Sequence, residues 1–259
     1  MPNQRLVQPR RQLLQRFAVC ALPAALFGAP QLSIAAIRQI TVGAATSIGD
    51  FVRALALQFE KTAPGVEVRV TVGASDIVAS QAIRGAPIDM LILADDLAMS
   101  RVVSAGLVQA GSIKTVARNR LVLVTRQKIA RLSDLNDKSI RRIAIGNPAV
   151  VPAGRYAREA FAISGVWTEI EGKVVHGNNV RQALEYMLKG EVDAAVVYQS
   201  DLLIKGAEKL SVFSLDIQAN YPMAILTGSR EPGLVAQFAA LAQSEPARAA
   251  LRQLRFDLP

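Results

Sequence analysis

The chain has 259 residues and a formal net charge of +9 at pH 7, and 51% of its residues are hydrophobic. Four arginines and no acidic residue lie within residues 1–35, so the rest of the chain carries only +5 of this charge. That part has no clustered Lys/Arg stripe interleaved with aromatic residues, so we expect no nucleic-acid partner. The single cysteine, Cys20, lies near the N-terminus, which excludes disulfide and thiol chemistry from the remainder.

Residues 1–36 have the layout of an export signal peptide. Arginines precede an apolar run at 17–27, and small residues follow at Ser33, Ala35 and Ala36. The run is shorter than the ~20 residues of a membrane-spanning helix, which argues against an uncleaved anchor. Arg10-Arg11 resembles a twin-arginine signal, but ordinary signals also contain paired arginines. We expect a periplasmic protein, cleaved near Ala35 or Ala36 and exported by either route.

About 224 residues remain, in which strands and helices alternate. Hydrophobic periodicity predicts strands at 38–43, 66–72 and 88–93, and helices at 48–61, 75–84 and 97–105. Ser47 and Asp50 form a capping-box pattern before the first helix. The third strand is nearly all apolar, so we expect it to be buried on both faces.

The later part of the chain repeats this alternation. Strands are predicted at 140–146, 173–176 and 194–198, with helices after Ala153 and Asn179 and two more at 233–242 and 246–254. The strands at 119–125 and 221–227 bracket this group. We expect them to cross between two α/β lobes. Lobe 1 is then residues 37–118 plus 221–259, and lobe 2 is residues 119–220.

The segment Val151-Pro152-Ala153-Gly154 stands where a buried strand gives way to an amphipathic helix. Pro152 restricts the backbone, and Ala153 is too small to cover the first N–H groups of the helix. These groups carry the positive end of the helix dipole, so the turn is suited to bind an anion. Ligands in such sheets bind beyond the carboxyl ends of the strands, so we expect several such turns to converge on one small oxyanion.

Several segments together resemble the periplasmic molybdate-binding proteins of bacterial ABC importers. The most specific are Val151–Ala157 (VPAGRYA) and Asn179–Leu184 (NVRQAL), and the others are Ile40-Thr41-Val42 with Ala45-Thr46-Ser47, Gly85–Asp89, Asn119–Val122, Gly146-Asn147-Pro148 and Val196-Val197-Tyr198 with Asp201. The resemblance covers essentially the whole chain after the signal. It implies a type II periplasmic-binding-protein fold, in which each lobe is a mostly parallel sheet flanked by helices and two crossing strands join the lobes.

The resemblance also implies the ligand and its contacts. The ligand would be molybdate, and also tungstate, delivered by a monomeric protein to an ABC permease in the inner membrane. The residues that correspond to the family's ligand contacts are the hydroxyls of Ser47, Ser75 and Tyr198 and the backbone amides of Ala153 and Val180. No cofactor, catalytic residue or direct metal ligand is implied. Each of these five residues ends a strand, and four also begin a helix, so strand ends and helix starts point to the same five residues as the resemblance.

Two residues depart from the family's pattern. Thr46 stands in the middle of the usual Ala-Ala-Ser, and Asp76 follows Ser75 where a small neutral residue is usual. We expect Asp76 to be a first-turn acid satisfied by its own helix. The alternative is that Asp76 faces the ligand, where it would accept from a protonated oxyanion such as hydrogen phosphate or repel dianions. The preferred oxyanion therefore stays open, with sulfate and phosphate as alternatives to molybdate.

An exported enzyme acting on an anionic substrate is the alternative from another class. It would use Ser47 or Tyr198 as the reacting group, but no base is placed next to either residue and a G-x-S-x-G elbow is absent.

His176, the only histidine, is interpreted as a surface or packing residue. Arg155 and Arg181 fall in the first turns of helices and are expected to be solvated, and Asp95-Asp96 lacks the companions of a metal site.

Overall fold

The computed structural model describes residues 37–259, so the expected signal peptide lies outside the described residues. The strands are β1 (Arg38–Ala45), β2 (Val66–Gly73), β3 (Met90–Ile92), β4 (Lys114–Thr125), β5 (Ile143–Gly146), β6 (Val174–Gly177), β7 (Ala194–Tyr198) and β8 (Ser211–Ile225). The α-helices are α1 (Gly49–Thr62), α2 (Ser75–Ile83), α3 (Asp96–Ser104), α4 (Pro152–Ile163), α5 (Trp167–Ile170), α6 (Val180–Lys189), α7 (Pro232–Ala242) and α8 (Glu245–Gln253).

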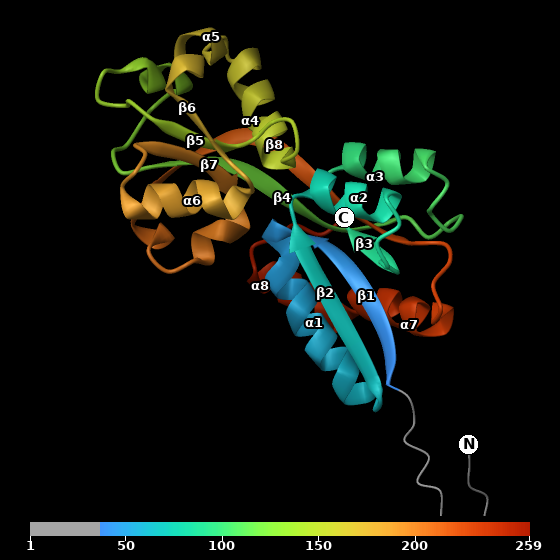
Figure 1. The fold of residues 1–259 in the computed structure, drawn as a ribbon. Coiled ribbons are helices and arrows are strands. Elements are labelled where there is room, and N and C mark those ends of the chain that lie inside the picture. The colour runs from blue at the N-terminus through green and yellow to red at the C-terminus, as the bar shows by residue number, and fades with distance from the viewer. Residues whose placement is uncertain (1–36) are drawn as a thin grey trace, which may run out of the picture. The chain divides into compact units, whose positions relative to one another are not determined.

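The strands form one mixed sheet in the order β2-β1-β3-β8-β4-β7-β5-β6. β1 pairs in parallel with β2 and β3, and β5 pairs in parallel with β6 and β7. β4 and β8 lie between these two groups and pair antiparallel with each other, as Figure 1 shows. The predicted α/β fold with two crossing strands is therefore confirmed.

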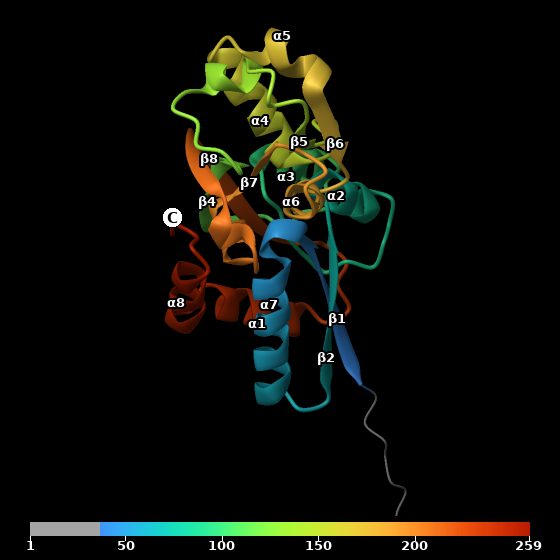
Figure 2. The same cartoon turned by 90° about the vertical axis from the view of Figure 1, so that its left-hand side faces the viewer.

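The central strands divide the described residues into two halves. The first half contains β1–β3 with α1, α2, α3, α7 and α8, and the second half contains β5–β7 with α4, α5 and α6 (Figure 1). α1 packs against β2, α2 packs against β1 and α3, and α7 and α8 both contact α1 (Figure 2). In the second half, α4 and α6 pack against β5 and β7, whose residues are all buried. Such strands are nearly all apolar because helices cover both faces.

Both crossing strands begin earlier than the sequence pattern predicts. β4 starts at Lys114 instead of residue 119, and β8 starts at Ser211 instead of residue 221. The pairing register shifts between Arg120 and Val122, and Asp216 in β8 has a positive φ of 51°. The alternation of more and less buried side chains nevertheless continues from Ser211 to Ala219, so this segment has the period of a strand, and the sequence-based prediction missed it.

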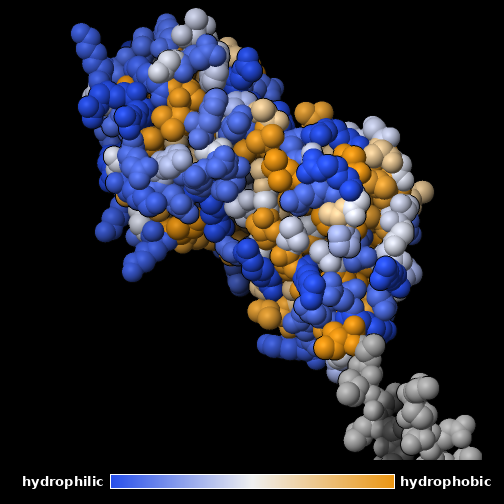
Figure 3. Space-filling model, in the orientation of Figure 1, coloured by the Kyte–Doolittle hydropathy of each residue, from blue (hydrophilic) through white to orange (hydrophobic). Residues whose placement is uncertain are grey.

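The surface carries hydrophobic side chains in separate groups. In the view of Figure 3 these groups lie among hydrophilic residues, and they are more frequent over the half that contains α2 and α3. Within residues 37–259, none of the helices has both the length and the apolar character needed to cross a membrane.

Candidate functional site

The structure brings all five predicted ligand residues to one small cavity. Ser47 follows β1, Tyr198 ends β7, and the other three lie in the first turns of α2, α4 and α6. The complete lining is Ala45, Thr46, Ser47, Ala74, Ser75, Ala94, Val151, Pro152, Ala153, Asn179, Val180 and Tyr198, without a charged side chain. The space open to the centre of a water-sized sphere is about 10 Å³, so the cavity suits a compact group and not a sugar or peptide.

Helix N-termini supply the backbone donors of the cavity. Pro152 is the first residue of α4 and no side chain caps this helix, which leaves the N–H of Ala153 without a helical partner. At α6 the Asn179 side chain accepts from the N–H of Gln182 over 3.0 Å, so it does not occupy the N–H of Val180. Because both helices direct the positive ends of their dipoles at the cavity, the potential there favours an anion.

A close approach between a helix and a strand places the amide of Ala153. A Cβ on Gly154 would lie 1.8 Å from the carbonyl oxygen of Gly146, and a Cβ on Gly146 would lie 2.3 Å from a methyl group of Val151. Only glycine at both positions lets the first turn of α4 sit directly on the end of β5. The VPAG segment therefore needs its glycine for packing, and this packing sets the position of the neighbouring amide.

The hydroxyls of the two serines are already bonded within the protein. Ser75 Oγ accepts from the N–H of Ala94 over 2.9 Å, and Ser47 Oγ lies 2.7 Å from the hydroxyl of Tyr221. The N-cap of α1 is Ile48, so the predicted capping box of Ser47 and Asp50 is wrong. Ser47 lies instead in a short 3-10 helix, Thr46–Ile48, which turns its side chain toward Tyr221.

Tyr198 differs from both serines, because its hydroxyl has no hydrogen-bond partner among residues 37–259. The side chain is 1% exposed, so solvent does not satisfy the hydroxyl either. Burial raises the pKa of Tyr198 well above its usual value, which keeps the hydroxyl protonated and able to donate. A buried donor without a partner costs stability, and such groups in native proteins call for an explanation. A ligand that accepts a hydrogen bond in the cavity would provide one.

Asp76 is a first-turn acid of α2, as expected, but it does not cap that helix and it does not line the cavity. One carboxylate oxygen accepts from Arg101 on α3 and the other from Arg155 on α4, each over 2.7 Å. Arg155 also binds the carboxylate of Asp95. Burial raises the pKa of Asp95, although the N–H of Ala98 and Arg155 act in the opposite direction. The expectation that Arg155 is solvated is therefore wrong.

Arg181 at the start of α6 makes a second set of ion pairs. Its guanidinium binds Asp50 on α1 over 2.9 Å and the fully buried Asp201 over 3.1 Å. Asp201 also accepts from the N–H of Tyr198 over 3.0 Å, so it supports the strand end that carries the tyrosine. Arg155 and Arg181 thus each join the second half to the first half beside the cavity.

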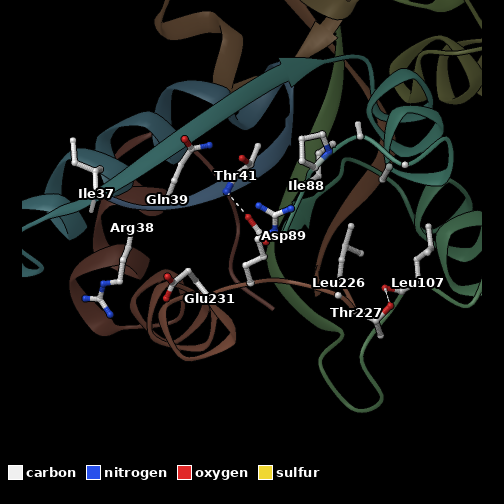
Figure 4. A pocket seen from close by; sticks show the side chains of 16 residues that line it. Ile37, Arg38, Gln39, Thr41, Ile88, Asp89, Leu107, Leu226, Thr227 and Glu231 are labelled. Carbon is white, nitrogen blue, oxygen red and sulfur yellow. Dashed lines mark hydrogen bonds between the residues drawn. The ribbon is translucent and has the colours of Figure 1, made fainter. Parts of the chain in front are cut away.

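A larger hollow of about 710 Å³ lies near the amino end of β1. Figure 4 shows its lining side chains, with Asp89 pointing toward the backbone of Thr41, whose N–H it binds over 2.7 Å. Unlike the small cavity, this hollow is lined by no buried donor that lacks a partner. Ligands of open α/β sheets bind at the carboxyl ends of the strands, which favours the small cavity despite its size.

Residues 37–259 do not bring together the groups of a Ser-His triad or of a His/Cys/Asp/Glu metal cluster. His176 is exposed and lines a separate surface hollow, whereas Ser47 bonds to a tyrosine and to no base. Among residues 37–259, no three His, Cys, Asp or Glu side chains are grouped to hold a metal ion.

Tyr221 is the residue of this region that the sequence analysis missed. It was interpreted only as the start of a crossing strand, but it is fully buried behind Ser47. The two residues are 174 positions apart, so no local pattern connects them.

Comparisons with known proteins identify the family of the chain and several relatives. Residues 40–254 match the family described as bacterial extracellular solute-binding protein. The molybdate-binding protein ModA of Escherichia coli (strain K12) is 31% identical over 84% of this chain and 88% of its own length.

Two solved structures share the fold. The periplasmic molybdate-binding protein of Azotobacter vinelandii superposes with a TM-score of 0.75 at 24% identity, over 85% of this chain and 99% of that one. The sulfate-binding protein SubI from Mycobacterium tuberculosis H37Rv gives 0.75 at 18% identity, over 85% and 86%. At this identity the two structures show the fold and not the ligand.

Proposed function

Because the chain belongs to the bacterial extracellular solute-binding protein family, we propose that it captures molybdate, and also tungstate, for import by an ABC transporter. It is a binding protein and not an enzyme, as its relatives are. The proposed ligand contacts are the hydroxyls of Ser47, Ser75 and Tyr198 and the amides of Ala153 and Val180.

The observation that carries this proposal is that Tyr198 lines the small cavity and that its buried hydroxyl has no partner among the described residues. The other proposed contacts are also donors, and the lining holds no carboxylate that would repel an anion. Charge-assisted hydrogen bonds from neutral groups, together with helix dipoles, can replace the water around a dianion. A compact oxyanion whose oxygen atoms all accept hydrogen bonds suits both the size of the cavity and the chemistry of its lining.

We further propose that the two halves are lobes, with residues 37–118 and 221–259 in lobe 1 and residues 119–220 in lobe 2. Ser47 and Ser75 then lie on one lobe and Ala153, Val180 and Tyr198 on the other. A ligand that contacts both lobes stabilises the closed form, so binding favours closure.

The cellular setting follows from the same proposal. Residues 1–36 would direct export and be removed near Ala35 or Ala36, and the monomeric protein would carry its ligand through the periplasm to the permease. The basic balance of the chain assists the capture of anions at low ionic strength.

Calorimetric titration of the purified protein with molybdate, tungstate, sulfate and phosphate tests the proposal. We expect molybdate and tungstate to bind most tightly, and phosphate to bind weakly because the lining offers no carboxylate acceptor for its proton. Tighter binding of sulfate or phosphate than of molybdate would reassign the ligand and leave the solute-binding role in place.

A further inference from the structure

We infer that Tyr221 is a positioning residue that fixes Ser47 as a hydrogen-bond donor toward the ligand and so favours unprotonated oxyanions. This inference rests on the proposed function. Tyr221 does not line the cavity itself, and it acts through the hydroxyl of Ser47.

The direction of the bond between the two hydroxyls follows from burial. Tyr221 is 0% exposed, and its hydroxyl makes a hydrogen bond of 2.7 Å with Ser47 Oγ. The side chain of Asn119 is the other polar group close to this hydroxyl. Burial raises the pKa of Tyr221 above its usual range, so the phenol keeps its proton and must donate it somewhere. If Ser47 donated to Tyr221 instead, the buried phenolic hydrogen would have to turn to Asn119, whose Oδ1 has no hydrogen-bond partner among residues 37–259, and the phenol would exchange a short bond for one that the structure does not show.

With Tyr221 donating, one of the two lone pairs of Ser47 Oγ is used and the hydrogen of Ser47 is free to point into the cavity. Tyr221, Ser47 and a bound oxyanion then form a chain of hydrogen bonds that all run toward the negative charge, and each bond strengthens the next. The ring of Tyr221 packs edge-on against Tyr198 at 6.0 Å and Phe256 at 5.3 Å, which holds the hydroxyl in place.

Ser75 has the same arrangement with a different donor. Its oxygen accepts from the backbone N–H of Ala94, a group that cannot become an acceptor. The pair of Ser47 and Tyr221 can reverse, because either hydroxyl could donate. When Tyr221 donates, the hydrogen of Ser47 is available to the ligand. In the reverse arrangement Ser47 uses its hydrogen on Tyr221 and presents only lone pairs, which suit the proton of hydrogen phosphate better than an unprotonated oxyanion.

A double-mutant cycle with S47A and Y221F, measured by molybdate calorimetry, tests the inference. Phenylalanine keeps the ring packing and removes only the hydroxyl, so we expect the Y221F protein to fold. In the wild-type background Y221F should weaken molybdate binding about three- to tenfold, the range of one neutral hydrogen bond. In the S47A background it should change the affinity less than about twofold, because the group through which Tyr221 acts is gone.

The ratio of phosphate to molybdate affinity distinguishes a hydrogen-bonding role of Tyr221 from a packing role, because a packing role would leave this ratio unchanged. Y221F leaves the Ser47 hydroxyl free to rotate and accept, so the ratio of phosphate to molybdate affinity should rise at least about threefold. The matched control is Tyr186→Phe, a partly buried tyrosine on α6 outside the cavity lining, which should leave both affinities unchanged. Thermal unfolding of each ligand-free variant verifies that it is folded.

The outcomes separate the two claims. Equal losses from Y221F in both backgrounds, or an unchanged affinity ratio, would overturn the role of Tyr221 and leave the proposed function standing. Failure of the wild-type protein to bind molybdate would instead overturn the proposed function.

Discussion

The guanidinium of Arg155 donates to the carboxylate of Asp76 over 2.7 Å and thereby joins α4 of the second half to α2 of the first half. The side chain of Asp76 is 5% exposed and that of Arg155 is 22% exposed, so water screens this pair only weakly. Arg155 lies two positions after Ala153, and Asp76 directly follows Ser75. The ion pair therefore connects the backbones of two proposed ligand contacts without entering the cavity.

We predict that Asp76→Asn leaves the order of oxyanion preference unchanged, because the carboxylate binds two arginines and does not line the cavity. The variant should lose about 1–3 kcal/mol of stability. This loss is smaller than that for a fully buried ion pair, because Arg155 still binds Asp95 and because Arg101 is half exposed and can be solvated. Chemical denaturation and titration with four oxyanions measure the two effects. The control is Asp50→Asn, whose carboxylate is 59% exposed and should cost less than about 1 kcal/mol. A selective gain or loss of phosphate binding in Asp76→Asn would show that the carboxylate reaches the ligand.

Ser47→Ala and Ser75→Ala should each weaken molybdate binding about ten- to a hundredfold. Each change removes one hydroxyl donor to a charged, desolvated ligand, which is worth roughly 1.5–3 kcal/mol. Calorimetry measures the effect, with Ser100→Ala on the exposed face of α3 as the control. If both cavity variants bind like the wild type, the two serines are not ligand contacts.

Tyr198→Phe should separate binding from stability. The hydroxyl has no partner among residues 37–259, so its removal should leave the melting temperature of the ligand-free protein unchanged or raise it slightly. The same change should weaken molybdate binding at least about tenfold. Differential scanning calorimetry with and without molybdate measures both quantities on one sample. A variant that is destabilised and still binds at wild-type strength would mean that the hydroxyl serves the fold.

The parts of the site that the sequence predicts are local. The turns that carry Ser47, Ser75, Ala153 and Val180 each follow a strand and open a helix within a few residues, so hydrophobic periodicity and turn residues locate them. The contacts that the sequence does not reveal are distant. Arg155 is 79 positions from Asp76 and Tyr221 is 174 positions from Ser47. Nothing near these residues in the chain indicates their partners, and an arginine in a first helical turn is solvated in most proteins.

The stability of the ligand-free protein should depend on pH through Asp201. Burial raises the pKa of Asp201 from 3.8 to about 6, against the opposing effect of Arg181. The folded protein thus keeps this proton up to about pH 6, whereas the unfolded chain releases it near 3.8. Because the folded state binds more protons between these values, the free energy of unfolding should fall as the pH rises, by on the order of 3 kcal/mol.

Denaturant titrations of the wild type and Asp201→Asn at pH 4, 5, 6 and 7 test this dependence. As the pH rises, the unfolding free energy of the wild type should fall relative to that of Asp201→Asn. Asp216→Asn, at an exposed position in β8, should follow the wild type at every pH. A wild-type to Asp201→Asn difference that stays constant from pH 4 to pH 7 would contradict a raised pKa.

The last prediction concerns closure of the two proposed lobes. Arg155 neutralises Asp76 and Asp95, two buried acids of the first half, only while the halves are together. Arg155→Met keeps much of the apolar stem and removes the charge, so the closed form should lose the ion pairs to Asp76 and Asp95 that join the halves and should become less stable. A ligand that binds the closed form then loses affinity by the factor by which that form is depopulated, whatever its chemistry. We therefore expect molybdate and tungstate to weaken by the same factor, with their relative affinity preserved.

Small-angle scattering supplies the structural measurement for this prediction. The wild type should show a smaller radius of gyration with saturating molybdate than without it, and Arg155→Met should need more molybdate to reach the compact form. Arg158→Met is the matched control, because Arg158 lies on the same helix and stacks over Trp167 within the second half. Identical radii of the wild type with and without ligand would show that the protein does not close on binding. A loss confined to one of the two oxyanions would instead place Arg155 in direct contact with the ligand.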